Sequence, residues 1–249
     1  MAVTARAILS CPHLRIAPLK RYASLAAGFL LLIAGTVARA DEAQPFVTNK
    51  DIDLTMILPP PPANDSAETK AELAEMLTLQ VTRTPEMEKR AIADAEENVW
   101  RFADVMGPKF NKETLPKFAA FFDRVAATEG AVVDPAKDVW KRPRPHQLSD
   151  LVKPVVKLSN SGSWPSGHAT VGTMMGIILS DMVPEKRAEI MARAAEYAHN
   201  RVVGGIHYPS DIEMGKISGS VIAAVLLSRP DFKAEYEEAR AELRSDLGM

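Results

Sequence analysis

Acidic residues are missing from the first 40 positions of this 249-residue chain. The basic residues there are Arg6, Arg15, Lys20, Arg21 and Arg39. An apolar stretch occupies 23–37, and Ala38-Arg39-Ala40 follows it. A basic region, an apolar stretch of about 15 residues and a small-x-small site are typical of a secretory signal peptide. We therefore expect residues 1–40 to be removed on export to the periplasm, with an uncleaved membrane anchor as the alternative, for which the stretch is short.

Cysteine is nearly absent, because the single one, Cys11, lies in that leader. Export would leave a chain without thiols, which excludes disulfides, cysteine nucleophiles and cysteine-based metal sites. The histidines show no metal-binding spacing either, so we expect neither a metal ion nor another cofactor. Stability must then come from a buried core, for which the chain is long enough.

Excess positive charge is also lacking once the leader is removed. Cleavage takes away five of the 30 Lys and Arg residues, leaving 25 against 32 Asp and Glu residues and a net charge of about −7. Neither a nucleic acid nor an anionic membrane is therefore an expected partner. No second long apolar run follows, so we expect a soluble protein with no stable membrane insertion after cleavage.

Alternation of apolar and polar residues, the pattern of strands, is not found over any convincing length. We expect an extended, proline-rich lead-in at 41–65, in which the prolines at 59–62 form polyproline II, and a single all-α domain at 66–249. The helices are predicted from Asp65, from Pro85 to Met106, from Leu115 to an end at Gly130, and at 166–182, 185–200, 209–228 and 230–246.

Three short segments carry residues of chemical interest. The first places four cations within eight residues of an otherwise acidic protein: Lys137, Lys141, Arg142 and Arg144. Pro143 and Pro145 prevent its second half from being helical, so the sequence predicts a rigid loop. A solvated basic surface loop is the alternative interpretation.

The second segment is Ser163-Trp164-Pro165-Ser166-Gly167-His168, which leads into an apolar helix. Ser166 is predicted near the helix cap, where free backbone N–H groups can bind a phosphate oxygen and Gly167 allows close approach. His168 falls in the first turn beside that site. Taken alone, such a histidine is more often a structural hydrogen-bonding residue.

The third segment runs from Asn200-Arg201 to His207-Tyr-Pro-Ser-Asp211. Pro209 suits the first turn of a helix, which puts His207 at its mouth and Asp211 one turn in. A carboxylate there can hold the proton of one ring nitrogen and leave the other as a nucleophile. A capped helix with a surface histidine is the alternative.

Together the segments supply what phosphoryl transfer needs without a metal ion. Arg144 and Arg201 can each hold phosphate through paired donors, and Lys137 adds a point charge. Two histidines can divide the work of nucleophile and acid. Cations and backbone donors would neutralise the charge on the phosphoryl oxygens.

The pattern Lys137-x6-Arg144-Pro145, Pro165-Ser166-Gly167-His168 and Arg201-x5-His207-x3-Asp211 resembles the three-part signature of the phosphatidic acid phosphatase type 2 superfamily. That superfamily contains bacterial class A non-specific acid phosphatases, lipid phosphatases and vanadium haloperoxidases. The signal peptide, the helical chain and the Leu58-Pro-Pro-Pro-Pro lead-in resemble the class A enzymes. The resemblance implies a compact helical bundle of the acid phosphatase/vanadium haloperoxidase type.

It also implies roles for single residues. His207 would attack phosphorus and become phosphorylated, Asp211 would orient it, and His168 would protonate the leaving alcohol and then activate water. The phosphate oxygens would be held by Lys137, Arg144, Ser166, Gly167 and Arg201. Asn200 departs from the family, which usually has serine before that arginine, and we expect this to tune activity rather than abolish it.

The remaining cations and histidines have no such role. Lys141 and Arg142 match no catalytic position and are interpreted as shaping the rim, while His146 and His199 are interpreted as structural or surface residues. A vanadium haloperoxidase and a non-catalytic helical binding module are the rival functions. The exported, compact chain favours a phosphatase over the first, and the presence of all eight motif residues argues against the second.

We expect broad hydrolysis of small-molecule phosphate monoesters, because a site that grips only the phosphoryl group tolerates many leaving groups. An acidic pH optimum is predicted, since His168 must be protonated while His207 is neutral. The preferred substrate is not set by the sequence. Formation of a homo-oligomer is left open, because related enzymes often self-associate.

Overall fold

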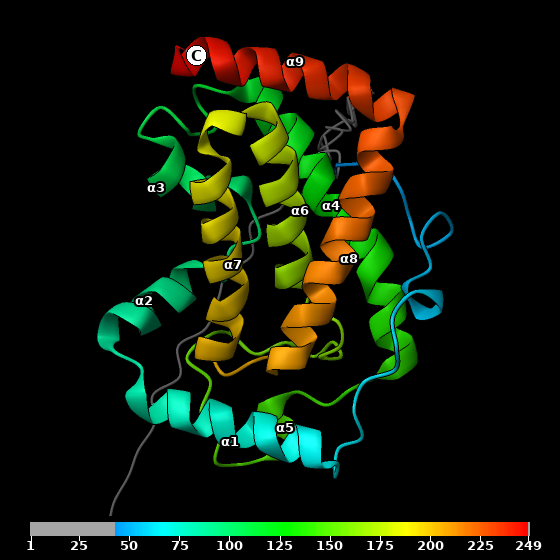
Figure 1. Ribbon diagram of the computed structural model, residues 1–249, viewed down its shortest axis with the longest axis vertical. Coiled ribbons are helices and arrows are strands. Elements are labelled where there is room, and N and C mark those ends of the chain that lie inside the picture. The colour runs from blue at the N-terminus through cyan, green and yellow to red at the C-terminus, as the bar shows by residue number, and fades with distance from the viewer. Residues whose placement is uncertain (1–42, 249) are drawn as a thin grey trace, which may run out of the picture. The chain divides into compact units, whose positions relative to one another are not determined.

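The computed structural model describes residues 43–248 of the chain. Nine α-helices and three short 3-10 turns, joined by loops, occur in this range, and no strand is found there (Figure 1). The predicted signal peptide at 1–40 lies outside the described residues. The helices are α1 (Ala67–Thr82), α2 (Pro85–Ala93), α3 (Ala103–Met106), α4 (Pro116–Trp140), α5 (Pro145–Leu148), α6 (Gly167–Met182), α7 (Arg187–Val203), α8 (Pro209–Ser228) and α9 (Pro230–Leu247). The 3-10 turns are η1 (Leu54–Met56), η2 (Val99–Phe102) and η3 (Pro184–Lys186). The all-α fold class expected from the sequence is confirmed.

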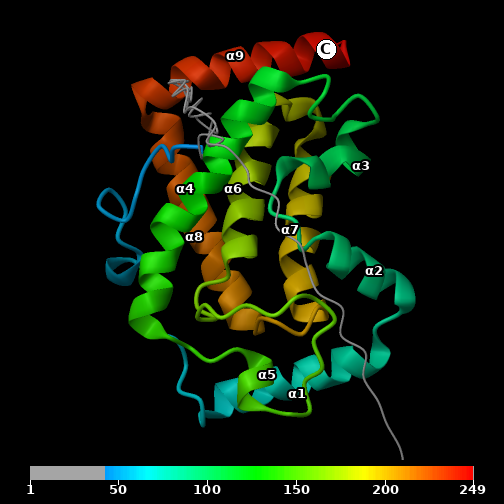
Figure 2. The same ribbon diagram turned by 180° about the vertical axis from the view of Figure 1, so that it is seen from behind.

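Helix α6 is the centre of the bundle. Nearly all of its residues are buried, as expected for a helix that is apolar all round. It packs against α4, α7 and α8, which run roughly alongside it (Figures 1 and 2). Gly215 lets α8 come close to the first turn of α6, because a β-carbon there would lie 2.6 Å from the carbonyl oxygen of Ser166.

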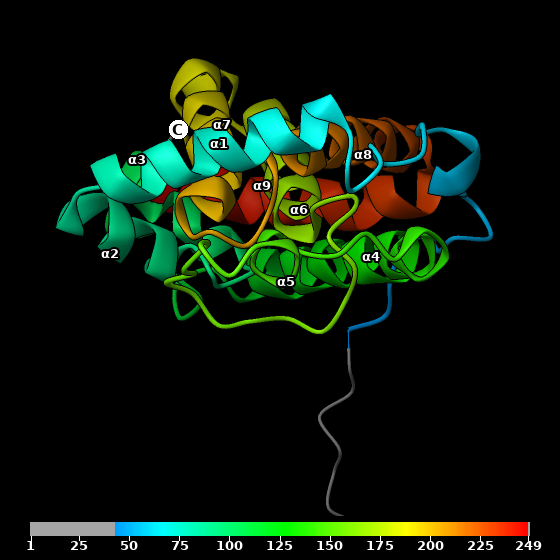
Figure 3. The same cartoon turned by 90° about the horizontal axis from the view of Figure 1, so that it is seen from below.

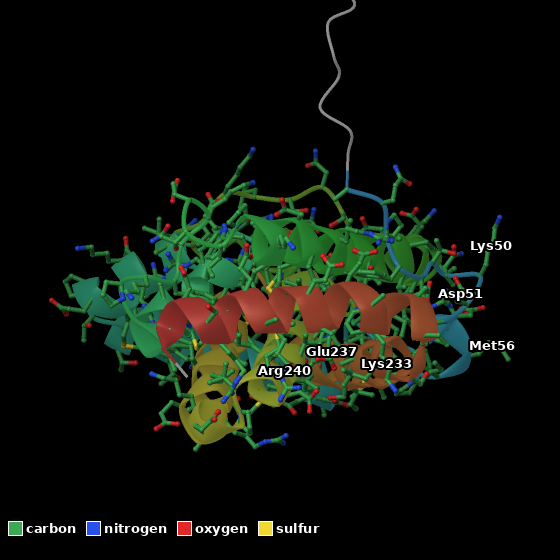
Figure 4. All side chains as sticks on the ribbon, turned by 90° about the horizontal axis from the view of Figure 1, so that it is seen from above. Lys50, Asp51, Met56, Lys233, Glu237 and Arg240 are labelled. Carbon is green, nitrogen blue, oxygen red and sulfur yellow. The ribbon has the colours of Figure 1, made fainter. Side chains whose placement is uncertain are left out.

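The two ends of this bundle are covered differently. At one end α9 lies across α4 and α8, burying Phe232 and Tyr236 while Lys233 and Glu237 face solvent (Figure 4). At the opposite end α1 and α5 lie across the bundle (Figures 1 and 3). Helices α4 and α7 finish at this second end and α6 and α8 begin there, so two C-termini and two N-termini converge.

Two of the predicted helices have wrong boundaries. The helix expected from Pro85 to Met106 breaks after Ala93, because Asp94 is buried with no exposed surface and bonds side chains of η2 and α7 instead of continuing the helix. The helix expected to end at Gly130 continues to Trp140. Burial of Val132 and Val133 in the core holds the helical backbone through that glycine.

The first basic segment is therefore not a loop throughout, since Lys137 lies in the last turn of α4. Only the residues after Trp140 are irregular, up to Pro145 at the start of α5. Within residues 43–248, none of the helices combines the length and the apolar character needed to cross a bilayer.

Candidate active site

A cavity of about 320 Å³ lies where the four helix ends converge. Six of the eight residues singled out in the sequence line it: Lys137, Arg144, Gly167, His168, Arg201 and His207. The other two, Ser166 and Asp211, lie next to this lining and have no exposed surface. The fold thus brings the three sequence segments together around one cavity.

His207 lies two residues before α8 and is only 2% exposed. Its Nδ1 is 3.1 Å from Oδ2 of Asp211, and its Nε2 is 3.0 Å from Nη1 of Arg144. A guanidinium has no acceptor, so Arg144 donates to Nε2 and the ring proton must sit on Nδ1, facing Asp211. This tautomer leaves the lone pair of Nε2 on the cavity side.

Burial and the nearby charges keep the His207 ring neutral. Burial, followed by the charges of Arg144 and Arg201, lowers the pKa of His207 well below its ordinary value of 6.5. Burial also raises the pKa of Asp211 to about 6, although Arg142 and a hydrogen bond from Ser163 act in the opposite direction. A neutral imidazole is the form that can act as a nucleophile.

Asp211 is held by four donors in all. Its Oδ2 accepts from the Ser163 hydroxyl at 2.5 Å and from the Tyr208 backbone N–H at 2.9 Å, besides His207. Its Oδ1 accepts from Nη1 of Arg142 at 2.7 Å. With this many partners the carboxylate has one orientation, and it transmits that orientation to the His207 ring.

The interpretation that Arg142 only shapes the rim is wrong. Arg142 is 3% exposed, and its Nη2 donates to Oε2 of Glu72 on α1 at 2.9 Å. Oε1 of Glu72 accepts in turn from the backbone N–H of Ser210, in the first turn of α8, at 2.6 Å. The guanidinium also lies over the Tyr208 ring, 4.0 Å from its centroid. Arg142 and Glu72 thus tie α1 to the Asp211 carboxylate.

Sequence reasoning missed these two residues for different reasons. Arg142 lies only two positions before Arg144 in the same basic segment, but it matches no catalytic position of the family and was therefore interpreted as a rim residue. Glu72 lies 139 positions from Asp211 on a helix with a mostly exposed surface, and nothing local marks it.

Arg201, in the last turn of α7, has unsatisfied donors. It is 3% exposed, and its Nε and Nη1 atoms are buried without any hydrogen-bond partner. Burial lowers the pKa of Arg201, yet the group still lines the cavity. Unpaired buried guanidinium donors are costly, and an anion in the cavity is the partner that would satisfy them.

Arg144 and Lys137 face the same cavity with partners of their own. Arg144 donates from Nε to the carbonyl of Ser161 at 3.0 Å and from Nη1 to the carbonyl of Ile206 at 3.1 Å. Burial lowers the pKa of Arg144 to about 10. Nζ of Lys137 lies 3.1 Å from Oδ1 of Asp134, which is exposed. The guanidinium of Arg144 is therefore fixed by main-chain carbonyls before any ligand enters.

The start of α6 follows the prediction for the second segment. Ser166 is the N-cap, and its hydroxyl accepts from the backbone N–H of Ala169 at 3.3 Å. Its own N–H donates to the carbonyl of Asp211 at 3.0 Å. The N–H groups of Gly167 and His168 belong to the first turn, which has no intrahelical acceptor for them. They add to the donors of a positive helix end at the cavity wall.

His168 lies between two acceptors of the loop after α2. Its Nδ1 is 2.7 Å from Oε1 of Glu97, and its Nε2 is 3.0 Å from the carbonyl oxygen of Ala95. Both partners are hydrogen-bond acceptors for the His168 ring. Burial acts to raise the pKa of Glu97, but the hydrogen bond and charge of His168 lower it. Glu97 was missed because the helix predicted over that stretch breaks there.

Asn200 does not face the cavity. Its side-chain amide donates to Oδ2 of Asp94 at 2.7 Å, and Arg193 of α7 donates to Oδ1 at 2.5 Å. Asp94 begins the loop that carries Ala95 and Glu97, the two partners of His168. Asn200 therefore anchors this loop to α7, and it is connected to His168 through the loop.

Lys141 and His199, two other residues considered in the sequence, do not line the cavity. Lys141 is exposed at the end of α4 with φ 49°, and His199 is exposed on α7. Over residues 43–248 no three His, Cys, Asp or Glu side chains are grouped in a way that could hold a metal ion.

Comparisons with known proteins show which family this chain resembles. Residues 124–234 match the PAP2 superfamily. A non-specific acid phosphatase of Salmonella typhimurium is 30% identical over 225 residues, which cover 86% of this chain and 90% of that protein. A non-specific acid phosphatase of Providencia stuartii is 28% identical over 200 residues, covering 77% of this chain and 81% of that protein.

A solved structure shares the fold. The crystal structure of a transmembrane PAP2 type phosphatidylglycerolphosphate phosphatase from Bacillus subtilis superposes with a TM-score of 0.50 and 17% sequence identity. The superposition covers 70% of this chain and 88% of that one. At this identity the similarity concerns the fold alone.

Proposed function

The chain belongs to the PAP2 superfamily and is an acid phosphatase, and we propose that it hydrolyses a broad range of phosphate monoesters through a phosphohistidine on His207. The observation that carries this proposal is the pair of buried, unpartnered donors of Arg201 beside the Nε2 lone pair of His207. Donors without a partner and a nucleophile with a fixed tautomer around one cavity are what an incoming phosphoryl group requires.

The first half of the reaction transfers the phosphoryl group to the protein. Nε2 of His207 forms a bond to phosphorus as the bond from phosphorus to the leaving oxygen breaks, and Arg144 moves its hydrogen bond from Nε2 to a phosphoryl oxygen. Asp211 accepts from Nδ1–H and stabilises the charge that develops on the ring. His168 gives one of its two ring protons to the leaving alcohol.

The second half releases phosphate. His168, now neutral, takes a proton from a water molecule whose oxygen attacks phosphorus on the side that the alcohol left. The bond from phosphorus to Nε2 breaks and His207 returns to its starting tautomer. Lys137, Arg144 and Arg201 supply the positive charge that stabilises the transition state, so the proposal includes no metal ion and no cofactor.

The remaining parts of the proposal concern substrate, pH and location. The charged lining grips the phosphoryl group and makes few demands on the leaving group, which supports broad specificity. Activity should be greatest at acidic pH, because His168 must hold its second proton while His207 stays neutral. The basic leader, apolar stretch and small-x-small site support export to the periplasm. Mass spectrometry of the exported protein should then find Asp41 as the first residue.

The decisive experiment is hydrolysis of p-nitrophenyl phosphate by the purified protein with a chelator or with vanadate, beside His207→Ala. We expect turnover in chelator, inhibition by vanadate, and a loss of at least about 10⁴-fold in kcat for the variant. His199→Ala, an exposed histidine of α7, is the matched control and should retain full activity.

Three results would contradict the proposal. Equal activity of His207→Ala and the parent would mean that another group is the nucleophile. Bromide oxidation with peroxide and vanadate that exceeds phosphate release would favour a haloperoxidase, and phosphate binding without turnover would favour a binding module.

A further inference from the structure

Glu129 is a buried carboxyl group in the wall of the phosphate cavity that the proposed mechanism does not use. It lies on α4 with 7% of its surface exposed, and it lines the cavity together with Lys137, Gly167 and Arg201. Its Oε1 atom is buried and has no hydrogen-bond partner. A carboxyl group in such a position needs either a counter-ion or a proton.

Lys137, a cation on the same helix, does not act as the counter-ion of Glu129. Nζ of Lys137 pairs with the exposed Asp134 at 3.1 Å, and it makes no ion pair with Glu129. The remaining groups that face Glu129 include the negative Glu97 from the loop after α2. Burial, with the charges of Glu97 and Asp134, raises the pKa of Glu129 to about 8 against the effect of Lys137. From the other elements around the cavity, the titratable set is completed by Arg144, Lys157, His168 of α6, Arg201 of α7 and His207 before α8.

Gly167 shows how close Glu129 lies to the position of a bound phosphate. A β-carbon at Gly167 would lie 2.6 Å from Oε1 of Glu129 and 3.1 Å from Nζ of Lys137. Both groups therefore come close to the α-carbon of Gly167, whose N–H belongs to the first turn of α6 and has no intrahelical acceptor. A phosphoryl oxygen held by that N–H and by Lys137 comes within reach of Oε1.

We propose that Glu129 is a phosphate-binding residue that acts as a carboxylic acid, donating its O–H to a phosphoryl oxygen when protonated and repelling the dianion when ionised. The inference rests on the proposed function, because it places the phosphoryl group in this cavity. Its consequence is an upper pH limit for substrate binding that is built into the wall of the site. Glu129 is neutral at the acidic pH at which an acid phosphatase is active, and it becomes charged at alkaline pH.

Sulfate is the probe that tests this, because it remains a dianion over the whole range from about pH 5 to pH 9 and cannot itself titrate. Isothermal titration should show that sulfate affinity of the parent falls about tenfold per pH unit above the pKa of about 8. Glu129→Gln keeps a donor and cannot ionise, so it should bind within a few-fold of the parent at about pH 5.5 and lose the additional alkaline fall. Glu113→Gln, an exposed glutamate before α4, should retain the profile of the parent.

A second measurement uses only the parent protein and does not depend on the folding of a variant. At about pH 8.5 most Glu129 side chains are ionised, so sulfate binding should be accompanied by uptake of about three-quarters of a proton. Titrations in buffers with different enthalpies of ionisation measure that uptake.

The outcomes separate this inference from the proposed function. If Glu129→Gln shows the alkaline fall of the parent, or if the parent takes up no proton, the role of Glu129 is overturned while the phosphatase stands. If the parent binds neither sulfate nor phosphate at any pH, the proposed function itself fails.

Discussion

On the cavity side of His207, Arg201 and Glu129 hold buried polar atoms that have no partner, whereas on the interior side Arg142, Asp211 and Ser163 hydrogen-bond one another and their neighbours. Both sides are almost fully buried and both are charged. The two sides differ in whether the protein or a ligand supplies the partners.

Buried polar atoms without partners cost stability, and such atoms in the wall of a cavity are open to compensation by a ligand. The cavity side keeps them beside His207, the proposed nucleophile, where a phosphoryl group would bring the missing partners. The interior side satisfies its groups within the chain and so fixes the orientation of Asp211 and of the ring it contacts. The contrast predicts that substitutions on the cavity side reduce activity, while those on the interior side also reduce stability.

The largest expected effect on activity from this comparison is that of Arg201→Ala. Loss of donors aimed at the transition state should lower kcat/KM about 10²- to 10³-fold. Stability should not fall, because Nε and Nη1 make no hydrogen bond in the free protein. Steady-state kinetics and chemical denaturation check both parts, with the exposed Arg187→Ala of the same helix as the control. A clear loss of stability with normal activity would remove the distinction between the two sides.

Arg142→Met should reduce both stability and activity. It leaves Glu72 and Asp211 buried without their shared cation, which should cost about 3–5 kcal/mol of unfolding free energy. Arg142 also holds the pKa of Asp211 down, so its loss should raise that pKa above about 6. The acidic limb of the activity profile should then move to higher pH, which a purely structural role would not produce. Arg142→Lys should restore part of both effects, and an unmoved acidic limb would contradict the positioning role.

Because of Glu129, the cavity side should make the free energy of unfolding depend on pH. Its pKa is raised on folding from 4.5 to about 8, so the folded protein binds this proton more tightly than the unfolded chain. Its contribution to stability is therefore complete below about pH 4.5 and is lost as pH rises toward 8, at no more than about 1.4 kcal/mol per pH unit. Glu129→Gln should flatten this part of a plot of unfolding free energy against pH, measured without phosphate or sulfate. Parallel curves for parent and variant would count against a protonated Glu129.

Asn200→Ser should have the smallest effect. The variant loses the hydrogen bond to Asp94, which should cost about 1 kcal/mol, since Arg193 and Arg101 still hold that carboxylate. Activity should change less than about threefold, because Asn200 reaches His168 only through the loop at 94–98. Thermal unfolding and kinetics at acidic pH test this, and a loss of activity above tenfold would place Asn200 in the reaction itself.

Most of the site residues could be named from the sequence because their placement depends on local rules. Pro209 starts α8, and the four-residue spacing brings His207, just before the helix, next to Asp211 in its first turn, at 3.1 Å. Ser166 is the N-cap of α6, as expected for a serine that precedes a glycine and a long apolar run. These features depend on neighbours within one turn of helix, which the chain order alone specifies.

The partners of those residues depended on the tertiary structure. Glu72 reaches Arg142 across 70 positions, and Glu97 reaches His168 only because the predicted helix breaks at Asp94 to bond α7. Glu129 lies in α4, which was expected from the sequence to end one residue later, at Gly130. The apolar pattern of this helix gave no reason to look for a functional group in it.

The sequence by itself therefore determined the helical class, the pairing of His207 with its carboxylate Asp211, and the capped start of α6 at the cavity. Only the tertiary structure decided which buried charges would be paired and which would be left for a ligand. The physical reason is that periodicity and capping describe contacts within a turn, whereas the pairing of buried charges depends on helices that approach from distant parts of the chain.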